Sequence, residues 1–284
     1  MKGTGLILEG GANRGIFTAG VLDFFQEHKI SFPYVVSVSV GSCNALDYKS
    51  GQTGRTKSCI IPGSRNIPPI HWRHLPGKKS VVNLDMVFDE YPNRLVPFDY
   101  DSYFSSPMIS EFVVTNCENG QAEYLTERED RSRLMQICRA SSSMPYLSPM
   151  VMLDGVPYLD GGIADAVPIR HAISRGYEKN IVILTREKGY LKKDSKAAQM
   201  LNRRFYKEYP DLIRTLESRF SRYNETMREL EQLETEGKVL IIRPDQVLAG
   251  RMDNHVSHLE DFYRQGYEVA ERHLGEIQRI ADLG

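Results

Sequence analysis

A serine lies at the boundary between a run of β-branched residues and a run of small ones. Residues 35–38 read Val-Val-Ser-Val, Ser39 follows, and residues 40–45 read Val-Gly-Ser-Cys-Asn-Ala. This order is typical of a nucleophile elbow, a sharp turn from strand to helix whose strained central residue projects its side chain beyond the sheet. The sequence therefore predicts Ser39 as a nucleophile.

The elbow departs from the common pattern G-x-S-x-G at one position. Gly41 supplies the second glycine, whereas Ser37 replaces the first. Both positions need small side chains so that strand and helix can approach closely, and serine meets that need less well than glycine. Ser37 lacks glycines at the matching offsets, so Ser39 is favoured over it, and Ser42 and residues 141–143 are predicted to be helix-start or loop serines.

A serine hydroxyl is a poor nucleophile at neutral pH, so it needs a base, and the anion formed on the attacked carbonyl needs hydrogen-bond donors. Residues 10–15 read Gly-Gly-Ala-Asn-Arg-Gly after a short apolar stretch. Glycines permit conformations in which successive backbone N–H groups converge on an anion. We expect Gly11 and Ala12 to donate to the oxyanion and Arg14 to add positive charge.

Asp160 is the predicted base. It follows an apolar stretch and precedes Gly161 and Gly162, so its carboxylate can lie at the mouth of a site without a bulky neighbour. The alternative is an ordinary turn aspartate, which Asp-Gly pairs often are. No histidine stands in a strand-end turn of the kind that positions a catalytic imidazole; the chain contains His28, His71, His74, His171, His255, His258 and His273.

Two strand–turn–helix units must position these residues. Residues 5–9 predict a strand and residues 16–28 a helix, with the glycine turn between them. Residues 34–38 predict a second strand, and a helix of small residues begins near Gly41. Two such units in succession favour a parallel sheet covered by helices.

Further strands and two amphipathic helices follow. Strands are predicted at 111–116, 122–125, 150–153, 156–159, 180–185 and 238–242, with hairpin turns at Asn119-Gly120 and Asp154-Gly155 and a short helix at 131–140. Helical spacing relates Leu216, Phe220, Tyr223, Met227 and Leu230, and again Leu259, Tyr263, Tyr267, Ala270, Leu274 and Ile277. Both stripes are predicted to pack on the core, and contact with a membrane is the alternative.

Residues 49–97 break the regular pattern. They are rich in Gly, Pro, Arg and Lys, with isolated aromatic residues, and predict a long irregular insert over the surface. Such segments within compact domains are often lids or binding loops, and a variable insertion is the other interpretation. The sequence leaves both open.

Length and composition limit the class of protein. The chain has 284 residues, is 41% hydrophobic and carries a formal net charge of -1, which allows a sizeable core and argues against nucleic-acid binding. The spacing of its four cysteines predicts reduced thiols and no metal site. The N-terminus lacks a signal-peptide pattern, and no stretch approaches the ~20 apolar residues of a membrane span. We expect a soluble cytoplasmic protein, with at most transient contact with a membrane surface.

The three motifs, in this order, resemble those of the patatin-like phospholipase family. They are the G-G-x-x-R-G turn at Gly10, Gly11, Arg14 and Gly15, the elbow at Ser39 and Gly41, and the D-G-G at Asp160, Gly161 and Gly162. The resemblance extends to the strand near Leu184 and implies a three-layer α/β/α fold with a mostly parallel central sheet. It also implies a Ser39–Asp160 dyad without histidine, an oxyanion hole built by residues 10–15, and no cofactor.

The expected organisation is a catalytic domain at 1–190, which includes the insert, and a helical C-terminal portion at 191–284 with one strand near 238–242, packed on the core. The expected activity is hydrolysis of carboxylic esters of lipids, as by a phospholipase A or lysophospholipase, through an acyl-enzyme. Two alternatives stay open: a general carboxylesterase or thioesterase, and an NAD(P)-binding protein that uses residues 10–15 as a dinucleotide turn. The sequence does not determine the oligomeric state.

Overall fold

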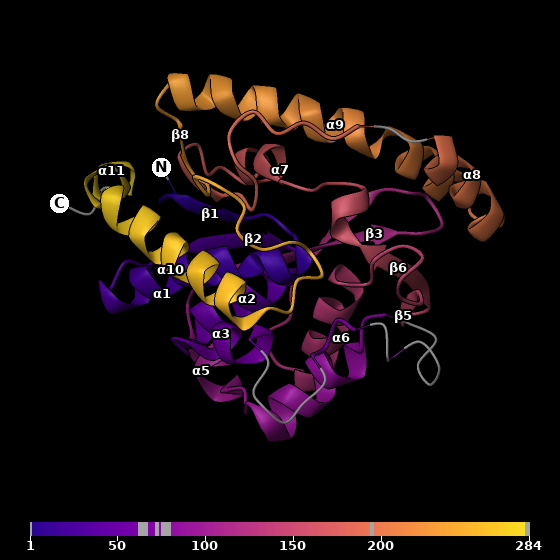
Figure 1. The fold of residues 1–284 in the computed structure, drawn as a ribbon, viewed down its shortest axis with the longest axis horizontal. Helices are drawn as coiled ribbons and strands as arrows, with labels where there is room; N and C mark the ends of the chain where they lie inside the picture. Colours follow the sequence, from indigo (N-terminus) through magenta and orange to yellow (C-terminus); the bar gives the residue numbers. More distant parts are fainter. Residues whose placement is uncertain (1, 62–67, 72–73, 75–80, 194–195, 282–284) are drawn as a thin grey trace.

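A mixed β-sheet with helices on both faces forms the centre of the molecule (Figure 1). The computed structural model describes residues 2–61, 68–71, 74, 81–193 and 196–281. Within these ranges no helix combines the length and the apolar composition that crossing a bilayer requires. The predicted three-layer α/β/α architecture with a helical C-terminal portion is confirmed.

The sheet is parallel at its centre and antiparallel at one side. Its strands run in the order β5-β6-β3-β2-β1-β7-β8, and β4 also pairs with β3. The five strands β3, β2, β1, β7 and β8 are parallel, whereas β4, β5 and β6 are antiparallel to their neighbours. The strands are β1 (Gly5–Leu8), β2 (Tyr34–Val38), β3 (Ile109–Asn116), β4 (Ala122–Leu125), β5 (Val151–Leu153), β6 (Val156–Asp160), β7 (Asn180–Ile183) and β8 (Val239–Ile242).

Successive side chains of the central strands point to opposite faces, and each face is covered by helices. Leu6 and Leu8 belong to one hydrophobic cluster and Ile7 to another. The Ile7 face is covered by α7 (Ile169–Ser174) and α9 (Pro210–Thr235), which lie above the sheet in Figure 1. The opposite face carries α1 (Gly15–Glu27), α2 (Val40–Ser50), α6 (Arg131–Ser141) and α10 (Val256–Arg272). Because apolar side chains point to both faces of the central strands, helices are needed on both sides.

Shorter helices complete the fold: α3 (Arg55–Ile60), α5 (Tyr100–Ser105), α8 (Lys196–Phe205) and α11 (Leu274–Ile280).

The C-terminal helix α10 approaches α1 closely because two glycines face each other across the contact. A Cβ atom on Gly20 would lie 2.0 Å from the carbonyl oxygen of Tyr263, and one on Gly266 would lie 2.1 Å from that of Phe17. The helical stripe predicted from Leu259 to Ile277 is not one helix, since α10 ends at Arg272 and α11 begins at Leu274.

The insert at 49–97 is less irregular than predicted. Its first two residues end α2, α3 follows, and a π-helix (Met86–Leu95) lies near its end. These helices were missed because they are short and because Pro92 lies inside one of them, so no sustained helical period is visible. Residues 62–67, 72–73 and 75–80 of the insert lie outside the described residues.

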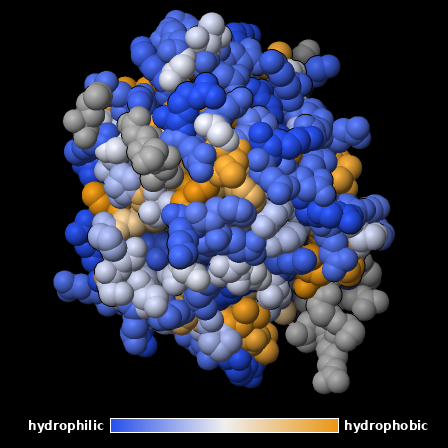
Figure 2. Space-filling view, turned by 90° about the vertical axis from the view of Figure 1, so that its left-hand side faces the viewer, coloured by the Kyte–Doolittle hydropathy of each residue, from blue (hydrophilic) through white to orange (hydrophobic). Residues whose placement is uncertain are grey.

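Hydrophilic side chains dominate the side of the molecule that carries α1 and α11. Figure 2 shows this side, with hydrophobic residues gathered in small, separate areas. The large apolar side chains of α1, such as Phe17 and Phe24, are buried. The apolar surface of these helices is therefore turned mainly to the core.

Substituting Gly266 by alanine is expected to lower the free energy of unfolding by about 1–3 kcal/mol, because the added methyl group overpacks a tight helix crossing. Chemical denaturation measures the change. Gly275→Ala in α11 is the matched control, since nothing lies within 4 Å of its added Cβ atom. Equal stabilities of the two variants would contradict the close crossing.

Candidate active site

Ser39 connects β2 directly to α2 in a strained backbone conformation. Its φ is 57° and its ψ is −127°, a region that residues other than glycine rarely adopt. Its N–H donates to the Ser141 hydroxyl at 3.0 Å, and its carbonyl accepts from the Ser42 N–H at 2.8 Å. Ser39 therefore stands at the apex of a sharp turn from strand to helix.

Small residues surround the elbow because the backbone passes close to it. A Cβ atom on Gly10 would lie 2.8 Å from Cβ of Ser39, and one on Gly41 would lie 2.8 Å from the carbonyl oxygen of Leu8. Ser37, which replaces the usual glycine, is fully buried in β2, and its hydroxyl lies 3.4 Å from the carbonyl oxygen of Glu111. The structure therefore accommodates a serine at this position within the sheet.

Strand order brings Asp160 beside the elbow. Val38 of β2 is in register with Val113 of β3, and the next residue, Val114, is in register with Asp160 at the end of β6. Asp160 is buried, and its Oδ1 accepts from the Gly162 N–H at 2.8 Å. Gly161 lies so close to β3 that an added Cβ atom would be 2.2 Å from the Val113 carbonyl oxygen.

Burial dominates the electrostatics of the Asp160 carboxyl group. Loss of hydration raises its pKa above the ordinary value. Hydrogen bonding with the Ser39 side chain and the Gly162 N–H, and the positive charges of Arg251 and Lys192, oppose that rise without reversing it. The carboxylate is thus a stronger base than an exposed aspartate, and it lines the same pocket as the Ser39 side chain.

The glycine turn lies against the same site. Ala12 has a φ of 51°, and the turn continues as a 3₁₀ helix (Ala12–Arg14) into α1. Among the described residues no acceptor is found for the N–H groups of Gly11 and Ala12. Gly15, in contrast, is a packing residue, because a Cβ atom there would lie 2.5 Å from the Val40 side chain.

Arg14 belongs to the turn, but it lines neither of the two pockets that Ser39 borders. Its side chain is buried, its Nε has no hydrogen-bond partner among the described residues, and a Cβ atom on Gly11 would lie 3.3 Å from that nitrogen. Burial, with a further contribution from Arg251, lowers the pKa of Arg14 to about 10. The guanidinium remains charged at neutral pH and contributes positive potential to the turn.

Two serines that the sequence interpretation treated as ordinary loop residues support the site. The Ser141 hydroxyl binds the Ser39 N–H and also lies 3.0 Å from the Ser42 hydroxyl. The Ser143 carbonyl accepts from the Asp160 N–H at 2.8 Å. Ser141 is the last residue of α6 and Ser143 lies just beyond its C-cap, so the end of this helix contacts both predicted catalytic residues. No local pattern could have identified them, since each contact links segments far apart in the chain.

Ser39 opens onto two pockets of different character. The first, which we call the polar pocket, is the more polar of the two and contains Ser39 and Asp160 together with the glycine turn and positive side chains. Its lining includes Gly10, Gly11, Ala12, Gly162, Lys192, Arg219 and Arg251, beside several apolar side chains. The last three of these residues belong to none of the three sequence motifs. Phe220, predicted to lie in the core, also lines this pocket.

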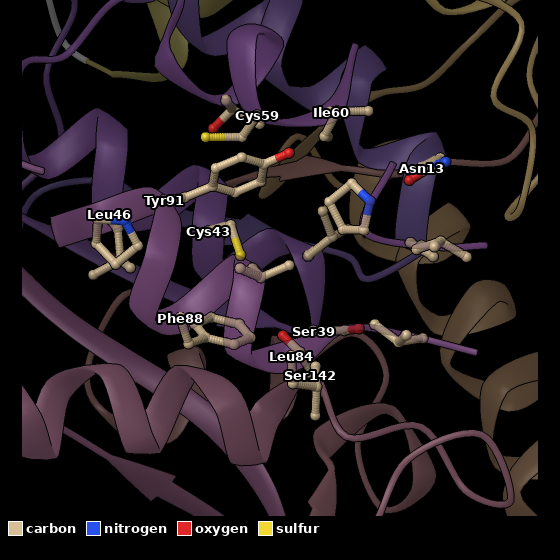
Figure 3. Close-up of a pocket in the computed structure, with 18 of the residues that line it drawn as sticks. Asn13, Ser39, Cys43, Leu46, Cys59, Ile60, Leu84, Phe88, Tyr91 and Ser142 are labelled. Carbon is tan, nitrogen blue, oxygen red and sulfur yellow. The ribbon is translucent and has the colours of Figure 1, made fainter. Parts of the chain in front are cut away.

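The second pocket is apolar and is walled largely by the insert. Figure 3 shows Phe88 and Tyr91 of the π-helix and Cys43 of α2 around the space that Ser39 borders. Further apolar lining comes from Leu46, Ile60, Ile70, Val82, Leu84, Val87 and Met135. Burial raises the pKa of the Cys43 and Cys59 thiols to about 12, so both stay protonated and unreactive at neutral pH.

Histidine lines neither pocket within the described part of the chain. His171 instead pairs with Glu111, with 2.6 Å between Nε2 and Oε2. The described residues contain one group with metal-ligand composition, formed by Asp253, His255 and His258, and both histidine rings hydrogen bond to Asp253. This group lies outside both pockets.

Comparisons with known proteins identify the family and the fold of this chain. The sequence profile of the patatin-like phospholipase family matches residues 6–173, and that of a domain of unknown function, DUF6363, matches residues 209–281. The crystal structure of VipD from Legionella pneumophila shares the fold, with a TM-score of 0.51 at 13% identity over 99% of this chain and 67% of that one.

Two curated relatives each match somewhat less than two thirds of this chain. The uncharacterised protein YjjU of Escherichia coli K12 is 28% identical over 185 residues, which are 63% of this chain and 51% of YjjU. The lysophospholipase NTE1 of Candida albicans is 24% identical over 192 residues, which are 64% of this chain and 13% of NTE1. The matched region thus spans about half of the first relative and a small part of the second. With the glycine turn, the elbow and the aspartate all inside the matched segment, this chain belongs to the patatin-like phospholipase family.

Proposed function

We propose that this protein is a serine acyl hydrolase that cleaves carboxylic esters of lipids, with Ser39 as nucleophile and Asp160 as base. The position of Ser39 carries the proposal: this residue has the strained backbone of an elbow, shares a pocket with the buried Asp160 carboxyl group and also borders the apolar pocket. Membership of the patatin-like phospholipase family supports the same class of reaction.

The reaction proceeds in two acyl-transfer steps. Asp160 accepts the proton of the Ser39 hydroxyl while the oxygen attacks the ester carbonyl, and the N–H groups of Gly11 and Ala12 donate to the oxyanion that forms. Collapse of this intermediate expels the alcohol, which takes the proton from Asp160, and leaves an acyl-enzyme on Ser39. Asp160 then deprotonates a water molecule that attacks the carbonyl of the acyl-enzyme. Collapse of this second intermediate breaks the bond to Ser39 Oγ, which takes the proton from Asp160, and the fatty acid leaves. Raised basicity of the buried carboxylate favours both proton transfers.

The apolar pocket fits a long fatty acyl chain better than the short acyl group of a simple carboxylic ester. Its wall combines aliphatic and aromatic side chains from the insert with the small residues that follow Ser39. Burial of methylene groups against such a surface contributes roughly 0.8 kcal/mol each. The dinucleotide alternative would need an acidic residue at the end of the second strand, and β2 instead runs into Ser39.

Replacing Ser39 by alanine is expected to abolish covalent labelling by a fluorophosphonate probe and to lower hydrolysis of a lysophospholipid by about 10³-fold or more, because the attacking oxygen is lost. Asp160→Asn should reduce both strongly, since the base is removed while the shape is kept. Intact-mass spectrometry and fatty-acid release measure the two effects. Ser142→Ala is the matched control, because Ser142 also lines the apolar pocket; labelling that persists in Ser39→Ala would refute the nucleophile.

The pH profile should report the buried base. Asp160 is active when deprotonated, so kcat/KM is expected to fall as the pH drops through its raised pKa, above the value of about 4 of an exposed aspartate. The substrate should be uncharged, so that only groups of the enzyme titrate in the profile. Circular dichroism at each pH checks that the protein stays folded. A profile that remains flat down to pH 4 would contradict a base of raised pKa.

Narrowing the apolar pocket should shorten the preferred acyl chain. Ile60 lies on α3 in the pocket wall, away from the strained turn (Figure 3). Ile60→Trp is expected to lower kcat/KM for a long-chain ester about tenfold and to leave a butyrate ester nearly unchanged, because only the long chain reaches the added ring. Rates across a series of p-nitrophenyl esters measure this. Equal losses at every chain length would place the acyl chain elsewhere.

A further inference from the structure

Three positive side chains line the polar pocket beside Ser39 and Asp160. Lys192 lies in the connection between β7 and α8, Arg219 in α9, and Arg251 in the connection between β8 and α10. All three follow the segment matched by the family profile, which ends at residue 173. Arg219 and Arg251 fall within the segment matched by the domain of unknown function.

Over the described part of the chain, these side chains form no ion pair with a carboxylate. Within the described ranges, none of the three makes an ion pair or a side-chain hydrogen bond. The Lys192 ammonium lies 3.4 Å from the centre of the Tyr223 ring, and the Arg219 guanidinium lies 4.5 Å from that of Phe220. By contrast, Arg214 on the same helix pairs with Asp211. The cations of the pocket therefore keep their donors available to a bound anion.

The nearby carboxylates are engaged elsewhere. Glu9 accepts hydrogen bonds from the Thr185 N–H at 2.7 Å, the Thr185 hydroxyl and the Tyr223 hydroxyl, and Asp160 accepts from the Gly162 N–H. Burial lowers the pKa of Lys192 to about 7, and although Glu9 opposes this effect, Arg251, Arg14 and Arg219 strengthen it. Like charges that lower one another's proton affinity are stabilised when an anion binds between them.

Hydrogen bonds fix the positions of two of these segments. The N–H of Asn13 donates to the carbonyl of Arg251 at 3.2 Å, and its amide nitrogen donates to the carbonyl of Asp253 at 2.8 Å. Asn224 of α9 binds both the N–H and the carbonyl of Lys192, each at 2.9 Å. Arg251 is therefore tied to the glycine turn, and Lys192 is tied to the helix that carries Arg219.

We infer that Lys192, Arg219 and Arg251 form a binding site for the phosphate group of the ester substrate. Two guanidinium groups and an ammonium match the charge and the several acceptor oxygens of a phosphate. The inference rests on the proposed function, since it places the scissile ester at Ser39, the acyl chain in the apolar pocket and the phosphate in the polar one. The preferred substrates are then acyl esters of glycerol phosphate, and the C-terminal segment selects them.

Matched substrates test this selectivity. Oleoyl lysophosphatidic acid and monooleoylglycerol share the acyl ester and differ in the phosphate, so their ratio of kcat/KM isolates its contribution. The double variant Arg219→Gln/Arg251→Gln is expected to lower that ratio tenfold or more. Arg214→Gln is the matched control on α9 and should leave the ratio within twofold of the wild type. An unchanged ratio in the double variant would overturn the inference.

A binding measurement separates this inference from the proposed hydrolase activity. In Ser39→Ala, calorimetry with glycerol 3-phosphate is expected to detect binding that glycerol lacks and that the two arginine substitutions weaken at least tenfold. This result together with no ester hydrolysis by the wild type would support the phosphate site and refute the hydrolase. Hydrolysis of both lipids at equal rates would refute the site alone. Binding of inorganic phosphate that the same substitutions weaken, without preference for the phosphorylated ester, would also overturn substrate recognition and leave a site for a small anion.

Discussion

The structure around the predicted site depends on the strained backbone of Ser39. A φ of 57° at a residue with a side chain costs of order 1–3 kcal/mol, so the surroundings must hold it. They do so from three directions: Gly10 leaves room above the serine, Gly41 lets α2 start against β1, and Ser141 binds the Ser39 N–H. The geometry of one residue thus requires the N-terminal turn, the sheet and the end of α6 to meet.

The same residue divides two chemical environments built by different parts of the chain. The insert supplies the apolar wall, and segments after residue 173 supply the positive one. Close packing of α1 and α10 at Gly20 and Gly266 holds the C-terminal portion against the family core, and Asn13 joins the loop at Arg251 to the glycine turn. Substrate selection in the proposed enzyme would then be separable from its chemistry, because different segments provide them.

The local sequence pattern predicted the exact bounds of some strands, but it did not predict several helices. The bounds of β2 and β4 match the prediction, because a β-branched run and an Asn-Gly turn are local signals. The helices of the insert were not predicted, because their helical period is short and weak. The break at His273 was not predicted either, because the apolar spacing continues from α10 into α11 although the helix is interrupted there. Phe220 fitted a core stripe by its spacing, yet it lines the polar pocket, because periodicity does not indicate what a helix face covers.

The sequence by itself determined which residues could form the site and which local structure each has. The turn at residues 10–15, the elbow at Ser39 and the aspartate before Gly161 are set by steric demands that act over a few residues. Only the tertiary structure decided that Asp160 faces Ser39, that Ser141 supports the elbow and that Lys192, Arg219 and Arg251 share one pocket. These contacts join segments far apart in the chain, so they follow from strand order and helix packing, which no local spacing encodes.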